Sequence, residues 1–137
     1  MSPPFLLDTS ALLAHYSGQP GQEIVAQVLQ LNADQVFTSV IAWLEFQVRL
    51  KDLTPEPTQR SEALDIYEQL LGQILPVTLA ISKLAFEMRE ATPSHLPNVL
   101  ALIAATARLR GATLLHREPQ FLAIPADLLS QAALPSK

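Results

Sequence analysis

The chain has 137 residues, of which 49% are hydrophobic and only 16% charged, with a net charge of −4 and no cysteine. This length is enough for one domain with a real core, spanning residues 1–137, and too short for two. The lack of cysteine excludes disulfides and thiolate chemistry, and the acidic balance argues against tight, charge-driven binding of nucleic acid, which can still be a transient substrate. The sparse charge also predicts a homodimer or a bound protein partner.

Short apolar runs that are typical of buried strands alternate with helical patterns along the whole chain. The expected strands are 5–7, 36–38, 74–77 and 113–115. The expected helices are 22–31, 39–51, 59–72, 79–91 and 97–111. Ser39 is a natural N-cap of the second helix, and the Pro-rich stretch 53–58 predicts a flexible loop. Alternation of this kind predicts an α/β fold around a parallel sheet.

Carboxylates follow three of these elements. Asp8 comes directly after the first strand, Glu118 follows the last strand, and Glu45 lies about one and a half turns into the helix after the second strand. Because ligands gather beyond the carboxyl ends of parallel strands, we expect the three side chains to converge at one edge of the sheet. Three carboxylates would suit Mg²⁺ or Mn²⁺, ions that support phosphodiester hydrolysis.

Four short motifs in the same order carry a family resemblance. They are Asp8-Thr9-Ser10, the stretch from Ser39 to Glu45, the helix 100–107 with the sequence Leu-Ala-Leu-Ile-Ala-Ala-Thr-Ala, and His116-Arg117-Glu118 followed by Phe121. The chain resembles a PIN domain of the VapC type over nearly its whole length. Each motif is weak alone, but four in order at the right spacing are specific.

The resemblance implies a PIN-like three-layer α/β/α sandwich with a central parallel sheet of four or five strands. It implies a Mg²⁺-dependent endoribonuclease, often the toxin of a toxin–antitoxin pair, with RNA as substrate and a cognate antitoxin as partner. The residues it assigns to catalysis and to the metal are Asp8, Glu45 and Glu118. Those it places near the substrate are Thr9, Ser10, His116 and Arg117.

Leu100 departs from the family pattern, which has a carboxylate at this position. Loss of that ligand predicts weak binding of Mg²⁺ or Mn²⁺ and impaired catalysis. Asn98 is a poor replacement, because two residues along a helix turn a side chain by about 200°. His116 is a better candidate to fill the space near the ion, although histidine favours softer metals. Leu100 also falls on an apolar stripe with Leu96 and Ile103, as a core residue would.

Simpler interpretations remain for the other residues. Asp8 could cap a short helix that follows it, and Glu45 could pair with Arg49 four residues later. The alternative for the whole protein is a PIN domain that has lost its chemistry and serves as a dimerising or protein-binding module. No apolar run is long enough to cross a bilayer, and the first four residues lack a signal-peptide pattern, so we expect a cytoplasmic protein.

Overall fold

The sheet contains five parallel strands in the order β3-β2-β1-β4-β5 in the computed structural model, which describes residues 2–137. The strands are β1 (Phe5–Leu7), β2 (Val36–Ser39), β3 (Gln73–Leu75), β4 (Thr113–His116) and β5 (Gln131–Ala133). Strands β1, β2 and β4 are buried along their whole length, which explains why they read as continuous apolar runs. The parallel sheet predicted from the sequence is confirmed, and it has five strands, the larger of the two numbers expected.

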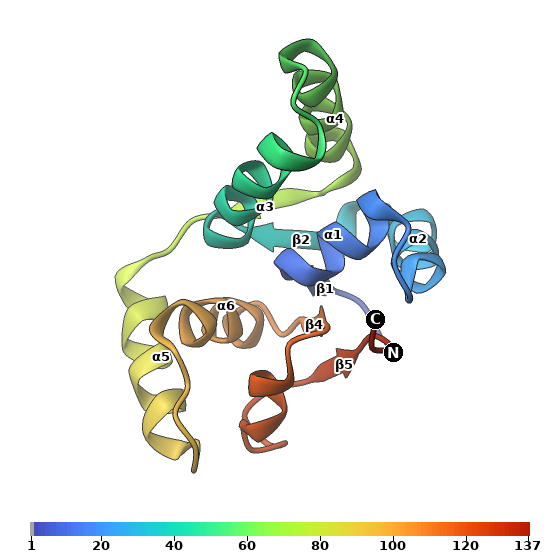
Figure 1. Cartoon of the computed structure of the whole chain (residues 1–137). Helices are drawn as coiled ribbons and strands as arrows, with labels where there is room; N and C mark the ends of the chain where they lie inside the picture. Colours follow the sequence, from blue (N-terminus) through green and yellow to red (C-terminus); the bar gives the residue numbers. More distant parts are fainter. Residues whose placement is uncertain (1) are drawn as a thin grey trace.

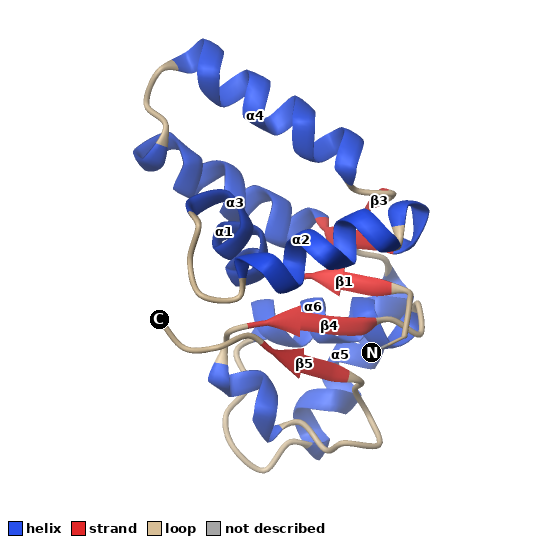
Figure 2. Cartoon of the chain, turned by 90° about the vertical axis from the view of Figure 1, so that its right-hand side faces the viewer, coloured by secondary structure: helices blue, strands red, loops and turns tan. Residues whose placement is uncertain are grey.

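Helices cover both faces of this sheet (Figures 1 and 2). The α-helices are α1 (Thr9–Ser17), α2 (Gln22–Leu31), α3 (Val40–Leu53), α4 (Pro57–Leu70), α5 (Leu79–Ala91) and α6 (Asn98–Leu109). Two short 3₁₀ helices, η1 (Ala33–Gln35) and η2 (Pro119–Ala123), lie in the connections. The resulting three-layer α/β/α sandwich is the architecture expected from the sequence.

Each face of the sheet has its own apolar core. One core joins α5 and α6 to the sheet around Met88, Ile103 and Leu114. The other joins α1, α2 and α4 around Leu12 and Phe46. Helix α3 contributes to both cores, so the acidic side chain it carries is held by packing on two sides of the molecule.

Local sequence signals account for the ends of these helices. Ser39 caps α3 as predicted, with its Oγ accepting a hydrogen bond from the amide of Ala42 at 3.1 Å. Helix α1 ends at Gly18, whose φ of 65° is a left-handed conformation that glycine adopts without strain. The stretch expected to be a flexible loop is shorter than predicted, because α3 continues to Leu53 and Glu56 already caps α4.

The structure corrects three further expectations. Strand β3 was expected at 74–77 but ends at Leu75, because Pro76 lacks the amide that would continue the ladder. Helix α1 was expected only as the short helix that Asp8 could cap, since its polar and apolar side chains follow no helical period. Strand β5 was missed, because its sequence, Gln-Ala-Ala, has no strand preference.

Helix α4 is the most loosely attached helix of its layer (Figure 1). All its residues are described, and Tyr67 alone among them is buried. The Tyr67 ring packs edge-on against Phe46 of α3, and its hydroxyl is 2.7 Å from Nδ1 of His15 in α1. Tyr67 is therefore the main buried contact of α4 with the sandwich, and the partly buried Leu64 packs against the same core.

Among the described residues, none of the helices has both the length and the apolar character needed to span a membrane.

Candidate functional site

The central pair of strands brings two carboxylates to one edge of the sheet. Asp8 directly follows β1 and Glu118 follows β4, and these two strands are hydrogen-bonded neighbours. The chain runs outward from β1 through β2 to β3 and then crosses back to β4, so the strand order reverses between β1 and β4. Crevices at such reversal points are where open α/β sheets bind their ligands. The amide of Asp8 donates to the carbonyl of Leu115 at 3.2 Å, which fixes Asp8 to that edge.

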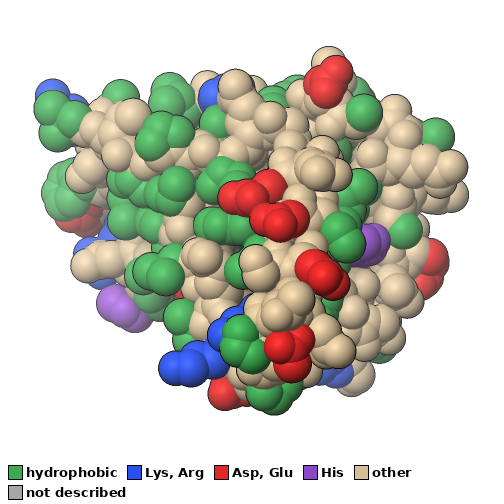
Figure 3. Space-filling model, turned by 90° about the horizontal axis from the view of Figure 1, so that it is seen from above, with side chains coloured by type: hydrophobic (Ala, Val, Ile, Leu, Met, Phe, Trp, Pro, Cys, Tyr) green, Lys and Arg blue, Asp and Glu red, His purple; other side chains and the backbone are tan. Residues whose placement is uncertain are grey.

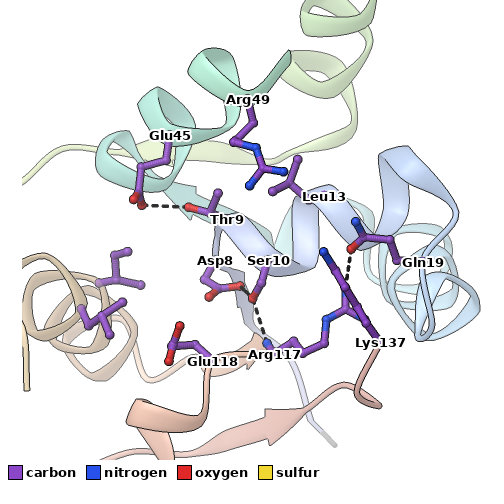
Figure 4. A pocket seen from close by; sticks show the side chains of 12 residues that line it. Asp8, Thr9, Ser10, Leu13, Gln19, Glu45, Arg49, Arg117, Glu118 and Lys137 are labelled. Carbon is purple, nitrogen blue, oxygen red and sulfur yellow. Dashed lines mark hydrogen bonds between the residues drawn. The ribbon is translucent and has the colours of Figure 1, made fainter. Parts of the chain in front are cut away.

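The Asp8 side chain both caps α1 and lines the cavity. Its Oδ1 accepts a hydrogen bond from the amide of Ala11 at 2.9 Å and another from the hydroxyl of Ser10 at 2.6 Å. The capping role and the placement in the site, which the sequence left as alternatives, are therefore compatible. Capping orients the carboxylate without removing it from the cavity, as Figure 4 shows.

Burial dominates the electrostatics of Asp8, which is only 4% exposed. Burial raises the pKa of Asp8 from 3.8 to about 6, the hydrogen bonds from Ser10 and Ala11 lower it, and the negative charge of Glu118 raises it further. A buried carboxylate with a raised pKa is stabilised either by a bound proton or by a cation beside it. Perturbed groups of this kind in a cavity are typical of functional sites.

The cavity at this edge has a volume of about 350 Å³ and walls of different character. Asp8, Glu45 and Glu118 line it together, so the predicted convergence of these three side chains on one cavity is observed. Leu100 and Ile103 of α6 provide an apolar wall. Three cationic residues, Arg49, Arg117 and Lys137, also line the cavity, and two of them, Arg49 and Lys137, were not predicted from the sequence. The available signal was that Arg49 follows Glu45 by one helical turn.

Glu45 reaches the cavity from α3 and is held by α1. The hydroxyl of Thr9 donates to Oε1 of Glu45 at 2.9 Å, a contact that joins the two helices across the cavity mouth. Figure 4 shows the Glu45 carboxylate turned toward Thr9, whereas the Arg49 guanidinium extends in another direction, toward Leu13. The alternative in which Glu45 serves only as the partner of Arg49 does not describe this arrangement.

Ser10 and Arg117 form a support beneath the carboxylates. The Ser10 hydroxyl donates to Asp8 and accepts from the backbone amide of Arg117 at 2.8 Å. The Arg117 guanidinium donates to the carbonyls of Pro20 at 2.7 Å and Pro135 at 3.1 Å. Ser10 therefore links the strand-end loops that carry Asp8 and Glu118, and the cationic group of Arg117 is engaged by the chain itself.

The structure places His116 outside this cavity, in the core beside β5. Its side chain is fully buried, and both ring nitrogens are engaged. Nδ1 accepts from the amide of Glu118 at 3.0 Å, so Nε2 carries the proton and donates to Oε1 of Gln131 at 2.8 Å. Burial lowers the pKa of His116, which keeps this neutral form. His116 therefore positions the Glu118 turn and does not occupy the space near Asp8.

The α6 wall offers no replacement for the missing acid. Leu100 is half-buried, lines the cavity and packs against the apolar core, so it combines the two placements considered for it. Asn98 lies instead in a separate pocket between α5 and α6. Within residues 2–137, no three His, Cys, Asp or Glu side chains come close enough together to form a metal-binding group.

The comparisons with known proteins identify the fold. The family profile of the PIN domain matches residues 5–127. The chain belongs to the PIN domain family. No curated protein sequence matches it. Several solved structures, among them VapBC and toxin–antitoxin complexes, match almost the whole of this PIN domain.

Three of these structures illustrate the similarity. The VapBC2 complex of Rickettsia felis, bound to a DNA fragment from its promoter, has a chain that is 23% identical, with a TM-score of 0.75 and coverage of 96% of this chain and 98% of that one. A toxin–antitoxin complex of Klebsiella pneumoniae is 28% identical, with a TM-score of 0.66 and coverage of 88% and 92%. The sarcin–ricin loop cleaving toxin VapC20 of Mycobacterium tuberculosis is 17% identical, with a TM-score of 0.66 and coverage of 87% and 93%.

The donor set of this PIN domain fits a hard divalent cation, with few protein ligands. Asp8 and Glu118 supply oxygen atoms at the same strand ends, and the burial of Asp8 favours a cation beside it. Mg²⁺ is commonly bound by one or two carboxylates, with water and substrate phosphate filling the remaining positions. Both ring nitrogens of His116 are occupied by hydrogen bonds within the chain, so His116 is not available as a ligand for a softer metal.

Proposed function

We propose that this PIN domain is a weak, metal-dependent endoribonuclease of the VapC type. The observation that carries the proposal is the buried Asp8 carboxylate, with its raised pKa, beside Glu118 at the reversal point of the sheet. Asp8, Glu45 and Glu118 would together hold Mg²⁺ or Mn²⁺, directly or through water. When bound, such an ion polarises the phosphodiester and lowers the pKa of the attacking water.

The remaining residues of the site would position these carboxylates. Ser10 fixes the orientation of Asp8 and the distance between the two strand-end loops. Thr9 holds Glu45 at the cavity mouth, where its hydroxyl also lies within reach of a phosphate. Arg117 and His116 hold the loop and the turn that carry Glu118. Arg117 and His116, which were expected near the substrate, would therefore position Glu118 instead of contacting the substrate.

Leu100 is the reason for the weak affinity in this proposal. A leucine at the cavity wall removes one negative charge and one ligand, and losses of this order cost about 10–100-fold in affinity or activity. We expect Mn²⁺ to bind in the millimolar range or above.

A nuclease assay tests the proposed function. The purified protein should cleave structured RNA slowly in Mn²⁺ and not in EDTA. Asp8→Asn should lower the rate of cleavage by about 100-fold or more. Glu90→Gln, an exposed carboxylate change on α5, is the matched control and should leave the rate unchanged. Cleavage that survives Asp8→Asn would place the chemistry elsewhere.

A catalytically inactive binding module is the second candidate. Apolar side chains of α3 lie exposed one turn apart, with Val40 at 40%, Leu44 at 60% and Val48 at 59%. Figure 3 shows hydrophobic side chains and a group of acidic ones side by side on the face of the molecule that is seen from above. Exposed apolar surface of this kind is typical of protein interfaces. If the wild-type protein and Leu100→Asp are both inactive on RNA, this candidate replaces the enzyme.

Both candidates include protein partners. We expect a cytoplasmic homodimer that buries about 1,000 Å² or more in total, and an antitoxin that covers further apolar surface. Light scattering at tens of micromolar should give the mass of a dimer. A monodisperse monomer without added partner would contradict the homodimer.

A further inference from the structure

The arginines of this chain divide into two kinds by what their guanidinium groups contact. Five of the six donate hydrogen bonds to backbone carbonyls or side chains of the chain itself, and they are Arg60, Arg89, Arg108, Arg110 and Arg117. Arg49 is the exception, because no hydrogen bond from its side chain occurs in the part of the chain that the structure describes, residues 2–137. It is exposed, and it lines the acidic cavity.

The location of Arg49 relates it to the carboxylates. It follows Glu45 by four residues on α3, which displaces it by about 6 Å along the helix axis. Figure 4 shows its guanidinium above α1 near Leu13, at the end of the cavity that Lys137 also approaches. The cavity therefore has an acidic end at Asp8, Glu118 and Glu45 and a cationic end one helical turn away. This separation is on the scale of a single nucleotide step.

A cation at this position addresses an electrostatic problem of the site. An RNA strand carries negative charge into a cavity lined by three carboxylates, on a protein whose net charge is −4. Arg117 also lines the cavity, but its guanidinium is engaged by the carbonyls of Pro20 and Pro135. Attraction by the protein as a whole therefore contributes little, and a local cation has to offset the repulsion. The planar guanidinium group suits this purpose, because its parallel N–H groups match two phosphate oxygens.

We propose that Arg49 binds the phosphate next to the one that is cleaved, with Lys137 beside it, so that a single RNA strand lies along the groove between α1 and α3. This inference rests on the proposed function, since it concerns the substrate of the same cavity. It assigns Arg49 to substrate binding rather than to the stability of the fold. The free guanidinium at the cavity wall is the observation that distinguishes it from the other arginines.

Binding in the absence of metal and of cleavage tests this role. A fluorescent single-stranded RNA with 2′-O-methyl riboses is titrated in EDTA against the wild-type protein, Arg49→Gln and Lys51→Gln, with fluorescence anisotropy as the readout. Lys51→Gln is the matched control, because Lys51 is an exposed cation on the same helix that does not line the cavity. Both variants change the net charge equally.

We expect Arg49→Gln to weaken binding by about fivefold and to reduce the slope of log K against log salt by about 0.7, the value for one phosphate contact on a single strand. Lys51→Gln should resemble the wild type, and Arg49→Lys should lie between Arg49→Gln and the wild type, because it keeps the charge and loses the fork. Unchanged melting temperatures would show that the variants are folded.

The outcomes separate this inference from the nuclease. Equal losses in Arg49→Gln and Lys51→Gln, or no binding by the wild type, would overturn the role of Arg49. If the wild type cleaves RNA in Mn²⁺ and Arg49→Gln cleaves and binds equally well, the nuclease stands and the inference is wrong. Binding that depends on Arg49 without any cleavage would support the phosphate contact of Arg49, and would overturn the nuclease and the placement of that phosphate next to a cleaved one.

Discussion

The two walls of the cavity differ in what their backbone and side chains provide. On the β1 and β4 side, Asp8 and Glu118 are positioned by strand ends, an N-cap and the bridging hydroxyl of Ser10. On the α6 side, Leu100 and Ile103 present hydrocarbon to the same space and continue into the core. One wall therefore presents positioned carboxylates, whereas the other presents only hydrocarbon. The α6 wall differs from the carboxylate wall through one side chain in particular, Leu100.

The hydrogen bonds that position the carboxylates are independent of the apolar wall opposite them. The hydrogen bonds around Asp8 serve the fold as well as the site, because they begin α1 and join two loops. A substitution at Leu100 touches none of them. The predictions below change one wall at a time, beginning with the largest expected effect.

Asp8→Asn should stabilise the protein at alkaline pH. The folded-state pKa of about 6 lies above the ordinary 3.8, so the stability that Asp8 contributes is fully present below pH 3.8 and is lost as the pH rises through 6. At pH 8 the buried charge costs about 3 kcal/mol. Asparagine keeps the acceptor oxygen for Ala11 without the charge, so urea unfolding in EDTA should show a gain approaching this value at pH 8 and little gain at pH 4.

The histidines make the free energy of unfolding change with pH in the opposite direction to Asp8, which provides an internal check. Burial lowers the pKa of both His15 and His116, so stability should fall as the pH drops below 6.5 in the parent and in Asp8→Asn alike. The difference between the two proteins therefore isolates Asp8. Asp52→Asn, an exposed change on α3, should show no comparable gain. A gain that does not depend on pH would contradict the electrostatic explanation.

Leu100→Asp should supply the ligand that the α6 wall lacks. We expect the affinity for Mn²⁺, measured by calorimetry, to rise by about 10–100-fold and RNA cleavage to increase with it. Leu100 is half-buried beside the cavity, so the loss of stability should stay near 1–2 kcal/mol. Val99→Asp adds the same charge to an exposed neighbour and should not change metal affinity. Unfolding of Leu100→Asp would show that the core contacts of Leu100 dominate.

Ser10→Ala changes a single hydroxyl on the positioned wall. The Ser10 hydroxyl lowers the pKa of Asp8, so its removal should raise that pKa further above 6, as NMR titration of the carboxyl carbon would show. Loss of one hydrogen bond to a charged group should cost about 1.5–3 kcal/mol when Asp8 is ionised and less when it is protonated. An unchanged pKa would mean that water replaces the hydroxyl.

The sequence predicts the positions of Asp8 and Glu118 because both follow strands, and parallel strands bring their ends together whatever the details of packing. It does not predict the direction of the last side chain of a strand. His116 shows this limit, since its ring turns into the core toward Gln131 of β5, a strand with no sequence signal. Arg49 shows a second limit, because whether an exposed cation is paired or free depends on contacts that spacing alone does not determine.

The attachment of α4 through Tyr67 has a consequence for folding cooperativity. A helix with one buried side chain can open at a free energy below that of global unfolding, so its amides should exchange with solvent as a separate unit. Helix α4 does not line the acidic cavity, and this opening leaves the strand ends in place. We therefore expect the sandwich to unfold as one cooperative unit, and α4 to open and close locally while the cavity stays assembled.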